Sequence, residues 1–127
     1  MADVNRGNRP LSPHLTIYRP QWTSMSSILV RITGIALFFG SILLVWWLIA
    51  AATSESAFAG IDGFLRSWFG LLILFAATWA IFYHMLGRLR HVIWDFGHFL
   101  DVETSEKMAM GMVGGATLLT LIVWVAL

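Results

Sequence analysis

Three long stretches of the chain contain no charged residue. They cover residues 32–52, 67–87 and 108–127, which are 21, 21 and 20 residues long. A membrane-spanning helix needs about 20 mostly apolar residues to cross about 30 Å of hydrocarbon. Lipid cannot pair with open backbone groups, and the alternating pattern of a barrel strand is missing. The pattern therefore predicts an all-α membrane protein with three transmembrane helices, at about residues 27–52, 65–96 and 108–127.

The segments outside these spans are short. Three prolines interrupt residues 1–26, and the first apolar run begins too late for a signal peptide. We expect a cytoplasmic N-terminal tail over residues 1–26, followed by a three-helix anchor over residues 27–127. Residues 53–66 contain two glycines, so we expect a short loop there. The second helix is expected to continue until Gly97, the first residue that breaks it.

Composition narrows the class of protein. The AVILMFWYC set makes up 58% of the residues and charged residues only 12%, whereas roughly a quarter of the residues in a soluble domain are charged. A net charge of +1 gives no basis for nucleic-acid binding. The absence of cysteine excludes disulfides, thiolate metal sites and iron–sulfur clusters held by this chain.

The basic residues predict the orientation in the membrane. Seven of the eight precede or open the first span or lie between the second and third, namely Arg6, Arg9, Arg19, Arg31, Arg88, Arg90 and Lys107. Only Arg66 lies between the first and second spans. Because cytoplasmic loops are rich in Lys and Arg, the N-terminus is expected in the cytoplasm and the C-terminus on the opposite side.

One histidine lies inside a predicted span. His84, Arg88, His91 and Asp95 follow i, i+4, i+7, i+11 spacing and share one helical face. A neutral imidazole in lipid needs a partner for each nitrogen, and haem iron with a backbone carbonyl or carboxylate would supply both. A hydrogen bond to a neighbouring helix explains the residue equally well. If haem has two histidine ligands here, the second comes from another subunit, because the other spans contain no histidine.

A second candidate site lies at the start of the first span. Ser27 and Arg31 are one helical turn apart, and both can donate hydrogen bonds to the oxygens of a small carbonyl ligand such as a quinone. Arginines at span ends are common, so the residues alone favour a membrane-surface anchor and a helix cap. In the third span, Gly111 and Gly115 form a G-x-x-x-G motif, which is consistent with close helix packing.

Three segments together resemble the cytochrome b membrane-anchor subunits of succinate dehydrogenase. The segment RPLSPHLTIY at residues 9–18 resembles the family pattern R-P-x-S-P-H-L-x-x-Y. The segment SILVRITG at residues 27–34 is similar to S-I-x-H-R-x-T-G, and residues 84–95 resemble H-x-x-x-G-x-R-H-x-x-x-D. The order and spacing of these segments cover nearly the whole chain.

The resemblance implies roles for individual residues. His84 matches the axial ligand of haem b. Ser27 and Arg31 match positions that help to form the ubiquinone site. Arg88 and His91 would lie near the haem propionates or the quinone pocket.

The resemblance also implies partners and a location. A second small membrane-anchor subunit would supply the other haem ligand. An iron–sulfur subunit would dock near Asp95 and pass on electrons that a flavoprotein subunit takes from succinate. The chain would lie in the bacterial inner (cytoplasmic) membrane, in contact with lipid and as part of a multi-subunit helical bundle, and would not itself act on succinate.

Two departures from the family pattern alter the expected site. Val30 stands where the family often has histidine, so any contact from that histidine is lost. The glycine after His84 is Gly87, one place early, and Arg88 occupies its usual position. Two alternatives to this function are a quinol:fumarate reductase anchor and a haem-free membrane scaffold.

Overall fold

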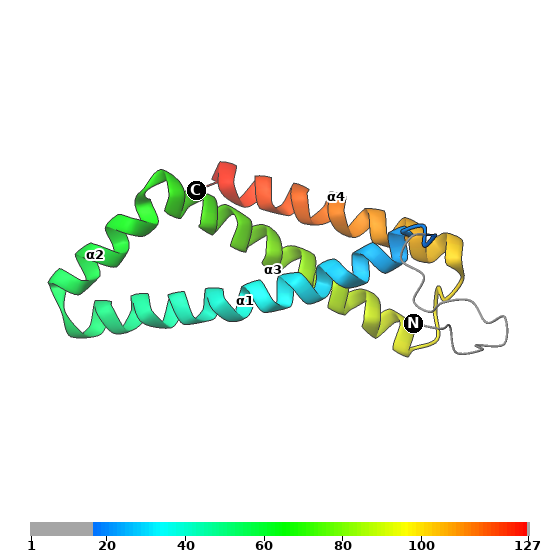
Figure 1. Ribbon diagram of the computed structural model, residues 1–127, viewed down its shortest axis with the longest axis horizontal. Helices are drawn as coiled ribbons and strands as arrows, with labels where there is room; N and C mark the ends of the chain where they lie inside the picture. Colours follow the sequence, from blue (N-terminus) through cyan, green and yellow to red (C-terminus); the bar gives the residue numbers. More distant parts are fainter. Residues whose placement is uncertain (1–16, 127) are drawn as a thin grey trace, which may run out of the picture.

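The computed structural model describes residues 17–126, which form four α-helices and no strand (Figure 1). The helices are α1 (Trp22–Thr53), α2 (Glu55–Arg66), α3 (Trp68–Asp95) and α4 (Val102–Ala126). Helices α1, α3 and α4 are each long and apolar enough to cross a membrane. The expected all-α fold with three spans is therefore confirmed.

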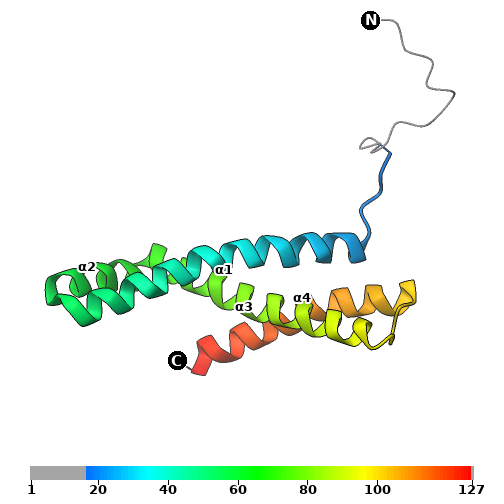
Figure 2. The same cartoon turned by 90° about the horizontal axis from the view of Figure 1, so that it is seen from below.

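Helix α3 is the central element of the bundle. It packs against α1, α2 and α4, and the paths of α3 and α4 cross in the view of Figure 2. The start of α1, the end of α3 and the start of α4 lie at one end, and α2 lies at the other (Figure 1). All the basic residues of the described chain except Arg66 thus lie toward the end without α2, and Arg66 lies on α2. Arg6 and Arg9 lie outside the described residues.

Helices α1 and α4 begin earlier than the apolar runs that they contain. Helix α1 starts at Trp22 and α4 at Val102, before the expected residues 27 and 108. Local caps account for both starts. The Ser24 hydroxyl accepts a hydrogen bond from the Gln21 backbone N–H at 3.2 Å, and the Asp101 carboxylate accepts one from the Thr104 N–H at 2.8 Å.

The expectation of a loop over residues 53–66 was wrong, because most of this segment is helix α2. Ser54 caps its start by accepting a hydrogen bond from the Ala57 N–H at 3.3 Å. Two glycines in an exposed helix cost about 1 kcal/mol each relative to alanine. Burial of Ile61 and the packing of half-buried Phe58 against Trp47, with ring centroids 5.5 Å apart, offset that cost.

An acidic side chain links α2 to α1. The Asp62 carboxylate accepts hydrogen bonds from Arg66 Nε at 2.6 Å and from Trp47 Nε1 at 3.5 Å. The hydrogen bond from the Arg66 guanidinium holds the pKa of Asp62 below its usual value. Helix α2 is therefore held against the far end of α1 by both apolar and polar contacts.

Helix α3 ends at Asp95, as the position of Gly97 predicted. Gly97 has a φ of +77°, a conformation that suits glycine. Phe99 also has a positive φ, of 57°. Its carbonyl accepts hydrogen bonds from Trp94 Nε1 at 3.2 Å and Ser105 Oγ at 3.3 Å, which hold the turn into α4.

The helices pack through residues spaced at intervals of three or four. On α3 the buried residues of this seam are Ala80, Tyr83, Gly87 and Arg90, and on α4 they are Ser105, Ala109, Met112, Ala116 and Thr120. Only one glycine of the G-x-x-x-G motif lies at the contact between α3 and α4. A Cβ on Gly115 would lie 3.1 Å from Leu86, whereas Gly111 has open space around it. Helix α4 therefore packs mainly through the neighbouring stripe.

Candidate functional site

The His84 imidazole is half-buried between α3 and α1. Its Nδ1 atom lies 3.0 Å from the Val30 carbonyl oxygen. A carbonyl oxygen only accepts hydrogen bonds, so Nδ1 carries the proton and donates. Nε2 then presents a lone pair, and Arg88 Nε donates to it at 3.1 Å. The tertiary fold thus fixes one tautomer of the ring and leaves Nε2 as the hydrogen-bond acceptor.

Two small residues of α1 accommodate the His84 ring. A Cβ on Gly34 would lie only 2.9 Å from His84 Cε1 and 3.4 Å from Nδ1. The hydroxyl of Thr33 lies 3.4 Å from Nδ1 and bonds to backbone carbonyls of its own helix. The T-G pair at residues 33–34 therefore forms a surface against which the imidazole lies in one orientation.

The other α3 candidates differ in their surroundings. The exposed Arg88 lies against His84, as their i, i+4 spacing predicted. His91 is half-buried and packs edge-on against Trp94, with ring centroids 5.3 Å apart. Asp95 is exposed at the end of the helix. Arg88 thus contacts the His84 imidazole, whereas His91 lies about one helical turn after Arg88 and packs against Trp94.

The α1 candidates lie beside Val30, the residue that contacts His84. Ser27 is half-buried and Arg31 is exposed. Within residues 17–126, neither side chain makes a hydrogen bond to His84, Arg88 or His91. Both side chains lie at the basic end of the bundle.

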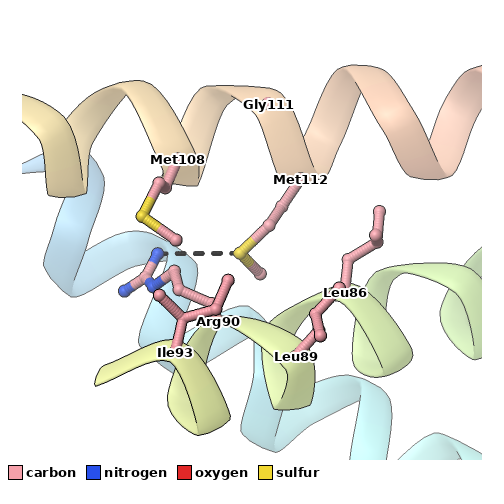
Figure 3. A pocket seen from close by; sticks show the side chains of 7 residues that line it. All are labelled: Leu86, Leu89, Arg90, Ile93, Met108, Gly111 and Met112. Atoms are coloured by element: carbon pink, nitrogen blue, oxygen red, sulfur yellow. Dashed lines mark hydrogen bonds between the residues drawn. The ribbon is translucent and has the colours of Figure 1, made fainter. Parts of the chain in front are cut away.

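The most buried charge of the described chain belongs to Arg90, which is not among the candidate site residues predicted from the sequence. Arg90 is 4% exposed, and its Nη1 donates to Ser26 Oγ at 2.8 Å and lies 3.6 Å from Met112 Sδ (Figure 3). Its guanidinium carbon lies 4.1 Å from the centre of the Trp94 ring. Tyr83 is fully buried and donates to the Ser26 carbonyl at 3.3 Å. Arg90 therefore joins α1, α3 and α4.

A signal in the sequence could have found Arg90. It follows Ala80, Tyr83 and Gly87 at steps of three, four and three, which is the spacing of a buried helix seam. Arg90 does not lie on the helical face that carries His84, so the spacing from His84 does not indicate it. The buried face of α3 does include it, and an arginine among buried residues needs polar partners.

The fold and the site define a class of protein. Three apolar helices with a tautomer-fixed imidazole at one end make a multi-pass membrane subunit that can offer one nitrogen ligand. The family of succinate dehydrogenase/fumarate reductase transmembrane subunits matches residues 5–123. The chain belongs to this family, and the expected multi-pass location in the bacterial inner membrane is confirmed.

Individual relatives match over nearly their full length. The succinate dehydrogenase cytochrome b556 subunit of Paracoccus denitrificans is 48% identical over 122 residues, covering 96% of this chain and 94% of the relative. The subunit of the same name from Rickettsia conorii is 39% identical, covering 92% and 91%. The cytochrome b560 subunit of Reclinomonas americana is 40% identical, covering 93% and 85%.

Proposed function

We propose that this chain is the haem b membrane-anchor subunit of a succinate dehydrogenase and helps to form its ubiquinone-reduction site. The observation that carries the proposal is the hydrogen bond from His84 Nδ1 to the Val30 carbonyl. Metal-ligating histidines usually donate their other ring N–H to a carbonyl or carboxylate. Relatives named as cytochrome b subunits support the same reading.

His84 Nε2 would be the axial ligand of the haem iron. Gly34 leaves the space that the ring occupies, and the exposed Arg88 side chain can swing from Nε2 toward a haem propionate. His91 would contribute to the propionate or quinone environment. Bound haem b would supply one-electron redox chemistry.

The second axial ligand would come from another small anchor subunit. Only 6% of the most apolar window of α1 is buried within this chain, so α1 needs lipid or other helices around it. A groove of about 310 Å³ also separates α1 from α3 toward the α2 end. Small residues line much of it, namely Ala36, Gly40, Ala76, Ala77 and Ala80. Such surfaces let a neighbouring helix backbone approach closely.

Ser27 and Arg31 would hold ubiquinone. A hydroxyl and a guanidinium can both donate hydrogen bonds to quinone oxygens, and the positive charge stabilises a reduced, anionic form. An iron–sulfur subunit would cover this end of the bundle near Asp95, and a flavoprotein subunit would take electrons from succinate. The anchor itself would make and break no bond of succinate.

Haem ligation is tested by spectra of the purified complex. The wild type should show a b-type band in the reduced-minus-oxidised spectrum, and His84→Ala should lose or shift it. His98→Ala is the matched control, because His98 is exposed beyond the end of α3. A normal band in His84→Ala would overturn the ligand assignment.

The same spectra test the haem-free alternative, and an assay of quinol oxidation by the same complex tests the fumarate reductase alternative. A haem-free scaffold predicts no such band in any variant. A fumarate reductase anchor predicts the band together with preferential oxidation of a low-potential quinol. The relatives named above are all succinate dehydrogenase subunits, which favours succinate oxidation.

A further inference from the structure

A pocket of about 180 Å³ lies between α3 and α4 near the basic end of the bundle. Its lining residues are Leu86, Leu89, Arg90, Ile93, Met108, Gly111 and Met112 (Figure 3). All the lining side chains except that of Arg90 are apolar. Leu89 is 54% exposed, so the pocket opens to the outside of the bundle.

The guanidinium of Arg90 is the one charged group of this pocket. Figure 3 shows it beside the side chains of Met108 and Met112. In the part of the chain that the structure describes, the ion pairs join Arg66 to Asp62 and Lys107 to Glu103, and no carboxylate pairs with Arg90. Its hydrogen bonds to Ser26 and Met112 both use Nη1. A buried cation needs a counter-charge or many hydrogen bonds, so Arg90 has unused capacity for an anion.

The position of the pocket restricts what the anion can be. Arg90 lies about 8 Å along α3 before its end at Asp95, given a rise of 1.5 Å per residue. Residues 86, 89, 90 and 93 share one face of α3, whereas 84, 88, 91 and 95 share another. An anion with an apolar tail can reach this pocket from the membrane without approaching His84.

We propose that this pocket binds an anionic phospholipid, with the phosphate at Arg90 and an acyl chain along Leu86, Leu89 and Ile93. The apolar walls match an acyl chain, and the single buried guanidinium matches the phosphate of the leaflet at the basic end. The pocket lies on a different face of α3 from His84, Arg88 and His91. It therefore does not rest on the proposed function of the chain.

Two glycines of α4 give a matched pair of variants. A Cβ on Gly111 or on Gly114 would meet no atom within 4 Å, but only Gly111 lines the pocket. Gly111→Leu should therefore fill the pocket without disturbing helix packing, and Gly114→Leu is its control. Arg90→Gln removes the charge together with the contacts to Ser26 and Met112, whereas the glycine pair leaves those contacts in place.

The test is native mass spectrometry of the delipidated, intact complex titrated with phosphatidylglycerol or phosphatidylcholine. Wild type and Gly114→Leu should bind one tightly held phosphatidylglycerol that Gly111→Leu binds about ten-fold more weakly or not at all. An assembled Arg90→Gln complex should lose the preference for phosphatidylglycerol over phosphatidylcholine. Equal binding by the two glycine variants, or equal affinity of the wild type for both lipids, would overturn the proposal. Displacement of the lipid by millimolar inorganic phosphate alone would reassign the site to a free anion.

Discussion

Gly87 of α3 lies directly against the side chain of Val30 of α1, so that a Cβ on Gly87 would collide with Val30 Cγ2. Both residues take part in the departures from the family pattern, since Val30 replaces a histidine and Gly87 is the glycine that lies one place early. The carbonyl of Val30 also accepts the hydrogen bond from His84. One residue of α1 therefore sets the distance to α3 through its side chain and the orientation of the imidazole through its backbone.

The Val30–Gly87 contact predicts a compensating pair of substitutions. Gly87→Ala should destabilise the complex by about 1–3 kcal/mol, because overpacking forces the helices apart. Val30→Ala with Gly87→Ala should recover much of that loss, since the smaller side chain leaves room for the new methyl group. Thermal unfolding of the four species in a double-mutant cycle measures the coupling. Additive effects would contradict the contact.

Gly34 should control the position of the His84 ring. A methyl group at Gly34 would lie 2.9 Å from His84 Cε1, so Gly34→Ala should tilt the imidazole and lower haem content or shift the b-type band. Gly60→Ala on α2 is the control, because its Cβ meets nothing within 4 Å. The haem-to-protein ratio and the reduced spectrum distinguish the two variants. Identical spectra would show that Gly34 does not constrain the ligand.

Arg31 should matter for quinone reduction and not for succinate oxidation. Arg31→Ala should lower succinate–ubiquinone activity by about ten-fold or more, because a charged hydrogen bond is lost. Arg31→Lys should retain part of the activity, and Arg19→Ala at the same end should retain nearly all. Succinate oxidation with a soluble artificial acceptor should stay normal in every variant. A parallel loss of both activities in Arg31→Ala would indicate failed assembly.

The start of α4 should respond to acid through Asp101. The hydrogen bond from the Thr104 backbone N–H holds the pKa of Asp101 below its ordinary value of 3.8. The carboxylate therefore stabilises the start of α4 fully when the pH is above the ordinary pKa. This stabilisation is lost as the pH falls through the lower pKa of the folded state. Asp101→Asn keeps a good cap that does not titrate, whereas Asp101→Ala removes the cap.

Hydrogen exchange of residues 102–107 measures this effect, with variants compared at each pH. Asp101→Ala should exchange faster than wild type near neutral pH. The difference between wild type and Asp101→Asn should change only as acid protonates Asp101. A constant difference across the acid range would contradict the lowered pKa.

The hydrophobic pattern by itself determined the class of fold. Runs of some twenty uncharged residues admit one solution in lipid, because a helix pairs its own backbone groups. The same pattern misled over α2. Gly60 and Gly63 suggest a loop, but Ile61 is buried and Phe58 packs against Trp47 of α1. The energy of these tertiary contacts cannot be seen in the local sequence.

The sequence also indicated His84, Arg88, Ser27 and Arg31 as candidates, since ionisable and polar groups near lipid are conspicuous. Which nitrogen of His84 carries a proton was decided only by the fold, which brings the Val30 carbonyl to Nδ1 across 54 positions of the chain. The burial of Arg90 between three helices likewise depends on how α1 and α4 pack on α3. Composition and periodicity describe one helix at a time, whereas these contacts are made between helices that come together only in the tertiary structure.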